Sequence, residues 1–130
     1  MESKQVLIDT NILIDYFQST SKEKTLLYSF LSEYRIAIST ITEFEISIGI
    51  NDKNKDFFEK LLQNIIIIPF DSSCAFIASK IYRDIKKSSS LIEVPDIFIA
   101  AIAVSFSIPL STLNKKHFSR IEVIECSYGE

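Results

Sequence analysis

The sequence predicts an α/β fold, a three-layer sandwich in which helices cover both faces of a central, mostly parallel sheet of four to five strands. Short runs of apolar, β-branched residues alternate along the chain with longer segments whose apolar residues recur at helical spacing. Such alternation favours right-handed crossovers and therefore parallel strands. The 130 residues, 47% of them hydrophobic, are enough to bury one core, so we expect a single domain over 1–130.

The first part of the chain predicts two strands and two helices. The apolar run at 6–8 is typical of a central strand that is buried on both faces. A short helix follows over 12–17, and the apolar residues within 22–33 predict a second one. Residues 36–38 then form the second strand.

Three helices and one strand follow. The first helix starts within 39–42 and ends at Gly49, and an amphipathic helix over 51–64 leads into the apolar strand 65–68. The third helix starts at 71–72 and extends to Lys87. The shared side of the first helix comprises Ile41, Phe44 and Ile48, together with Glu45. The apolar stripe of the third comprises Ala75, Ala78, Ile81, Tyr82 and Ile85.

The C-terminal part predicts a loop at 88–90 and an almost wholly apolar helix that starts at Pro95 and ends near residue 106. A strand is expected at 110–113 and a final one at 121–124. With the earlier strands, these complete the predicted sheet.

The composition excludes several classes of enzyme. With only two glycines, Gly49 and Gly129, the chain cannot contain a P-loop, a dinucleotide-binding loop or a nucleophile elbow. One histidine, His117, and two separated cysteines cannot form the usual zinc sites. A bound metal would therefore have oxygen ligands, which favours Mg²⁺, with Mn²⁺ as the other candidate.

Two unpaired cysteines and the lack of a signal-peptide pattern suit the cytoplasm. The longest apolar stretch, 97–110, is too short to cross a bilayer, so we expect no membrane association. The net charge of −3 argues weakly against broad electrostatic binding of nucleic acid, so any RNA contact needs local basic patches.

Polar side chains follow the predicted strands at the points where ligands collect in α/β sheets. Asp9 ends the first strand, Glu45 lies just over one turn into the helix after the second, and Asp96 opens the apolar helix. Asn114 follows the strand at 110–113. Taken singly, Asp9 and Asp96 could simply cap helices.

Taken together, four ordered segments resemble the motifs of the PIN domain family, in particular the VapC-type toxins of bacterial toxin–antitoxin pairs. Residues 6–15 are similar to the first motif, an apolar strand that ends in Asp-Thr-Asn. Residues 39–49 resemble the second, whose spacing selects Glu45 rather than Glu43. Residues 95–103 and 111–118 resemble the third and fourth.

The resemblance implies a magnesium-dependent ribonuclease that hydrolyses phosphodiester bonds by in-line attack of an activated water. It implies that Asp9 and Asp96 hold the metal and that Glu45 completes the cage or orients the nucleophile. Asn114 stands where many relatives carry Asp, so a second metal ion would be held less firmly. Residues expected to support the ligands by hydrogen bonds are Thr10, Asn11 and Thr112. Residues expected to contact RNA are Lys115, Lys116 and Arg120.

The resemblance also implies an antitoxin that blocks the acidic pocket and a homodimer. Leu26, Leu27 and Phe30 form an apolar face that is either the dimer interface or part of the core. Two alternatives remain open. Asn114 is compatible with a PIN scaffold that binds RNA or protein without cutting. Asp71, which also follows an apolar strand, is compatible with a receiver-like signalling domain.

Overall fold

The computed structural model describes residues 4–87, 92–113 and 126–128. Five strands form one sheet in the order β3-β2-β1-β4-β5, and all four strand pairings are parallel. The strands are β1 (Lys4–Ile8), β2 (Tyr34–Ser39), β3 (Ile66–Ile68), β4 (Leu110–Thr112) and β5 (Cys126–Tyr128). The predicted parallel sheet is confirmed, whereas the strand expected at 121–124 lies outside the described residues, as does the loop at 88–90.

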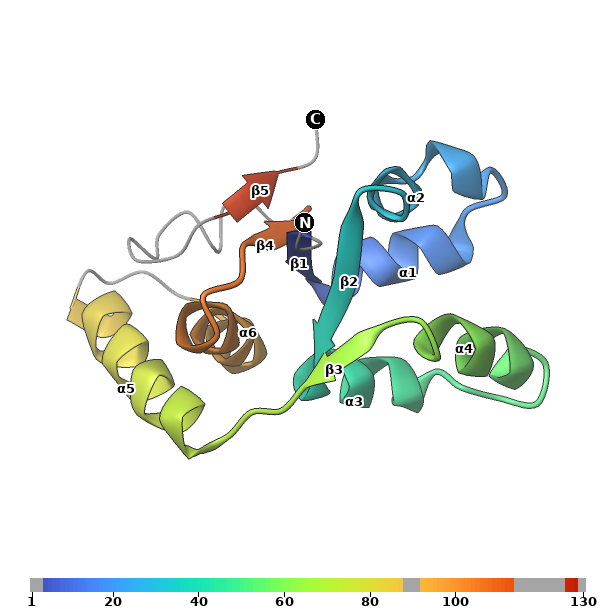
Figure 1. The fold of residues 1–130 in the computed structure, drawn as a ribbon. Coiled ribbons are helices and arrows are strands. Elements are labelled where there is room, and N and C mark those ends of the chain that lie inside the picture. The colour runs from blue at the N-terminus through green and yellow to red at the C-terminus, as the bar shows by residue number, and fades with distance from the viewer. Residues whose placement is uncertain (1–3, 88–91, 114–125, 129–130) are drawn as a thin grey trace.

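Helices cover both faces of the sheet (Figure 1). They are α1 (Thr10–Gln18), the 3₁₀ turn η1 (Lys22–Lys24), α2 (Leu26–Phe30), α3 (Thr40–Ile48), α4 (Lys55–Leu62), α5 (Ser72–Lys87) and α6 (Val94–Ser105). Alternate residues of β1 enter different cores, because successive side chains of a strand point to opposite faces. Leu7 packs in the cluster that contains α5 and α6, and Ile8 packs in the one that contains α1, α2 and α4.

The helix predicted over 22–33 is broken at Thr25. The Thr25 hydroxyl donates to the carbonyl oxygen of Lys22 (2.6 Å) and accepts the backbone N–H of Tyr28 (3.4 Å), so it ends η1 and caps α2. Local bonds of this kind compete with a continuous helix. Leu27 and Phe30 are buried, so these two residues belong to the core and are not available to an interface.

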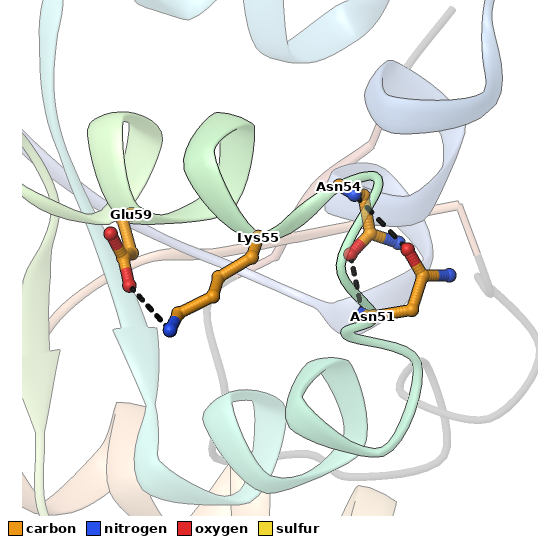
Figure 2. Close-up of polar contacts among 4 residues, drawn as sticks. All are labelled: Asn51, Asn54, Lys55 and Glu59. Atoms are coloured by element: carbon orange, nitrogen blue, oxygen red, sulfur yellow. Dashed lines mark hydrogen bonds and ion pairs between the residues drawn. The ribbon is translucent and has the colours of Figure 1, made fainter.

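The helix predicted over 51–64 starts only at Lys55, because a compact turn precedes it (Figure 2). Asn51 Oδ1 accepts the backbone N–H of Asn54 (3.0 Å), and Asn54 Oδ1 accepts that of Asn51 (2.8 Å). Asn side chains commonly satisfy backbone groups in turns in this way. The helix that follows carries an exposed ion pair between Lys55 and Glu59 (4.0 Å).

Two predicted apolar faces differ from those observed. In α3, Phe44 and Ile48 are 65% and 71% exposed, and the buried residues are Thr42 and Ile46. In α5, Ala75 and Tyr82 of the predicted stripe are also exposed, and Cys74 is buried instead, alongside the correctly predicted Ala78, Ile81 and Ile85. No helix in the part of the chain that the structure describes is long and apolar enough to cross a membrane.

Candidate active site

Asp9 lies at the carboxyl end of the central strand β1 and caps α1. Its Oδ1 accepts the backbone N–H of Thr10 (2.8 Å), and its Oδ2 accepts the hydroxyl of Thr112 at the end of β4 (2.7 Å). Its own N–H donates to the carbonyl oxygen of Ser111 (3.0 Å). Only 2% of Asp9 is exposed, and the start of α1 and the end of β4 each donate a hydrogen bond to one oxygen of its carboxylate.

Burial raises the pKa of Asp9 above its ordinary value, and the negative charges of Asp96 and Glu45 raise it further. The hydrogen bonds from Thr112 and Thr10 act in the opposite direction, because they stabilise the charged form. The three acids predicted from the sequence are therefore close enough to interact electrostatically. A bound cation would offset the electrostatic repulsion between these carboxylates.

Glu45 is half-buried on α3, and Thr10 holds it from the adjacent helix. The Thr10 hydroxyl donates to Glu45 Oε1 (2.8 Å), while the Thr10 backbone N–H donates to Asp9. A single residue thus bonds to two of the three acids. The Thr10 hydroxyl also lies 2.9 Å from that of Thr42, which in turn contacts Ser39.

Asp96 lies in the first turn of α6 and is half-buried. Pro95 occupies one of the first two helical positions, where its missing N–H costs nothing. The positive end of the helix dipole favours a carboxylate here. Asp96 thus reaches the site from α6, which packs in the core cluster that also contains α5. Thr10 and Glu45 come from α1 and α3 instead.

The donor set fits a hard divalent cation, because Asp9, Glu45 and Asp96 offer only oxygen atoms. Their placement is looser than the predicted cage. Within 4–87, 92–113 and 126–128, no three His, Cys, Asp or Glu side chains come together as a metal site. Like charges repel, and Glu45 Oε1 accepts a hydrogen bond from the Thr10 hydroxyl.

A groove of about 240 Å³ opens beside Glu45, between α1, α3 and α4. Apolar side chains dominate its walls, among them Leu13, Phe17 and Phe58. This groove gives another molecule an apolar route to Glu45.

The other predicted residues fare differently. Thr10 and Thr112 contact the acids as expected, whereas Asn11 is exposed on the first turn of α1 and takes no part in these hydrogen bonds. Four predicted residues lie outside the described part of the chain: Asn114, Lys115, Lys116 and Arg120. Asp71, which suggested the receiver-like alternative, is exposed, and its Oδ1 accepts the backbone N–H of Cys74 (2.9 Å) at the start of α5.

Sequence reasoning placed Ser39 and Thr42 within the second motif but gave them no role in the site. Both are fully buried, and Ser39 caps α3 by accepting the N–H of Thr42 (3.0 Å). Their three-residue spacing at a helix start was available as a capping signal. Their link to Glu45 depends on the approach of α1 to α3, which no local pattern reveals.

Comparison with known proteins yields consistent matches. The family model described as PIN domain matches residues 6–124. Ribonuclease VapC1 of Methanocaldococcus jannaschii is 38% identical over an alignment of 130 positions, which covers 93% of this chain and 84% of the relative. A crystal structure of DNA-bound VapBC from Salmonella typhimurium has the same fold, with a TM-score of 0.85 at 22% identity over 96% of this chain and 98% of that one. A toxin–antitoxin complex from Klebsiella pneumoniae matches with a TM-score of 0.70 at 28% identity, over 92% and 95%.

Proposed function

Because the chain belongs to the PIN domain family, we propose that it is a divalent-metal-dependent ribonuclease and the toxin of a toxin–antitoxin pair. The observation that carries the proposal is the buried Asp9 carboxylate, whose pKa is raised by burial and by two neighbouring acids. Burying a carboxylate near like charges is costly unless the site serves a cation. The ribonuclease name of the archaeal relative supports the same reading.

In this proposal, Asp9 and Asp96 hold Mg²⁺, or Mn²⁺, directly or through water. When bound, the cation supplies Lewis-acid stabilisation of the phosphate and a water of lowered pKa for in-line attack at phosphorus. Thr112 and the N–H of Thr10 keep Asp9 in place, so the site needs little reorganisation. Glu45, aimed by the Thr10 hydroxyl, orients the attacking water. The products would be a 5′-phosphate and a 3′-hydroxyl.

Asn114 would contribute its amide oxygen beside these acids, and the basic residues Lys115, Lys116 and Arg120 would contact phosphates of the RNA. All four belong to the proposal on their sequence positions alone. With three carboxylates and one amide, we expect a single tight metal ion before RNA binds.

We further propose an antitoxin partner, in keeping with the toxin–antitoxin complex from K. pneumoniae. The apolar groove beside Glu45 is where we expect this partner to bind and cover the acidic site. A homodimer, a single domain over 1–130 and a cytoplasmic location complete the proposal. Since Leu27 and Phe30 are buried, exposed apolar side chains such as Phe44, Ile48 and Phe76 are the ones available to a dimer.

The test is cleavage of structured RNA by the purified protein with Mg²⁺, beside the double variant Asp9→Asn/Asp96→Asn. The wild type is expected to cut, and both EDTA and the double variant are expected to abolish cutting. Asp52→Asn is the matched control, since it makes the same charge change on an exposed acid. Equal cleavage by the wild type and the double variant would refute the site, and binding of RNA without cutting would favour the scaffold alternative.

The toxin role has its own test. We expect a small reading frame beside the gene, whose purified product stops cleavage when it is added to the assay. In cells, expression of the wild type should arrest growth, and expression of the double variant should not.

A further inference from the structure

We propose that Ser39 and Thr42 are positioning residues for Glu45, which they orient through the hydroxyl of Thr10. This inference rests on the proposed ribonuclease function. Three contacts carry it: Ser39 Oγ to Thr42 Oγ1 (3.3 Å), Thr42 Oγ1 to Thr10 Oγ1 (2.9 Å) and Thr10 Oγ1 to Glu45 Oε1 (2.8 Å). They form one continuous chain of hydroxyl groups that ends on a carboxylate.

The direction of this chain follows from counting protons. An ionised carboxylate only accepts, so the single hydroxyl proton of Thr10 points to Glu45. Thr10 must then accept from Thr42, whose own proton is thereby used. Thr42 must in turn accept from Ser39. Each hydroxyl has one allowed orientation, and all three dipoles point toward Glu45.

Burial makes this order strict. Ser39 and Thr42 are fully buried and Thr10 is nearly so, which leaves little room for water to replace a missing partner. Aligned hydrogen bonds in a region of low dielectric strengthen one another. The Ser39 oxygen is fixed as well, because it accepts the N–H of Thr42 at the start of α3.

The row of hydroxyl groups affects Asp9 as well as Glu45, because Thr10 bonds to both acids. Its N–H bonds to Asp9 and its hydroxyl bonds to Glu45, so a rotation of its side chain would free one acid while the other stays held. Thr42 prevents that rotation by donating to the same hydroxyl oxygen. The spacing between the two acids is therefore set by residues that touch neither metal nor substrate.

Thr42→Val tests this directly, since it keeps the side-chain shape and removes the hydroxyl. We expect kcat for RNA cleavage to fall about tenfold while KM stays within about twofold, because a catalytic group is misplaced and substrate binding is not. Thr42→Ser restores the hydroxyl and should recover kcat to within about threefold of the wild type. Ser47→Ala is the matched control on the same helix, as that exposed hydroxyl donates to the carbonyl oxygen of Glu43 in its own helix.

A second measurement uses the metal-free protein. Three-bond NMR couplings to the Thr10 methyl group report its χ1 rotamer, which should be single in the wild type and in Thr42→Ser and averaged in Thr42→Val. A single rotamer in Thr42→Val, or an unchanged kcat, would overturn the inference. If valine prevents folding, Thr42→Ala takes its place in both measurements.

The two arms separate this inference from the proposed function. A wild type that does not cut RNA refutes the ribonuclease, and the claim of positioning for catalysis falls with it. The NMR arm still decides whether Thr42 controls the rotamer of Thr10. A wild type that cuts, together with an unaffected Thr42→Val, refutes the positioning role alone.

Discussion

Replacing Thr112 by valine removes the hydroxyl that donates to Asp9 Oδ2 at 2.7 Å and leaves a buried carboxylate oxygen without that bond. Hydrogen bonds to charged groups contribute about 1.5–3 kcal/mol, and valine fills nearly the same volume, so this range is the expected loss of unfolding free energy. For 130 residues it corresponds to a fall in melting temperature of about 5–11 °C. Urea unfolding at neutral pH in EDTA measures it.

The loss should depend on the charge of Asp9. The pKa of Asp9 in the folded protein is raised above the ordinary 3.8, so its ionisation opposes folding. Stability therefore falls as pH rises from about 3.8 through the folded pKa. The Thr112 hydrogen bond limits that fall, because it lowers the pKa. Thr112→Val should therefore cost most above the folded pKa and less near pH 4.

A double-mutant cycle provides the decisive comparison. In an Asp9→Asn background the same substitution breaks only a neutral contact and should cost roughly 0.5–1.5 kcal/mol. The two changes should thus be coupled by about 1 kcal/mol. Equal losses from Thr112→Val in both backgrounds would refute the assignment of the bond to the Asp9 carboxylate, and Thr112→Ser, which keeps the hydroxyl, should stay close to the wild type.

Three further outcomes are expected. Asp9→Asn should raise the melting temperature of the protein in EDTA, because it removes a buried charge that opposes folding, and Asp52→Asn should not; a lower value for Asp9→Asn would contradict the electrostatic argument. Mg²⁺ should raise the melting temperature of the wild type by an amount that grows with the logarithm of its concentration above Kd, and scanning calorimetry should find little such shift for Asp96→Asn. Lys22→Met should lower the unfolding free energy by about 1–3 kcal/mol in urea titrations, because the ammonium donates to two carbonyl oxygens near the end of α1 at 2.9 Å. An equal loss for the exposed Lys53→Met would argue against it.

The sheet was predictable because its strands are short and apolar. Residues 6–8 and 36–38 are buried on both faces, and such runs have few other uses in a chain of this size. The position of Asp9 followed from the sheet, since parallel strands bring their carboxyl ends to one edge, and Pro95 marked the helix start that carries Asp96. These parts of the fold and the site depend on local patterns.

The remainder depends on tertiary contacts. Phe44 and Ile48 suggested the buried side of α3, but Thr42 is buried instead, because the Thr10 hydroxyl offers it a partner from another helix. The break at Thr25 has the same origin, a hydroxyl that finds backbone groups outside a continuous helix. Hydrophobic spacing alone does not detect such polar partners, so it predicted neither the exposed face of α3 nor the chain that ends on Glu45.

The way in which α1 is fastened bears on how the site meets RNA. A helix of nine residues is too short to persist alone in water, and here both of its ends are tied. Asp9 and Thr10 secure its start, and the Lys22 ammonium secures its last turn. Its amide hydrogens should therefore exchange with solvent only when the whole domain opens, without fraying first. In the proposed ribonuclease, we therefore expect the RNA strand to adjust to a site whose shape α1 already holds.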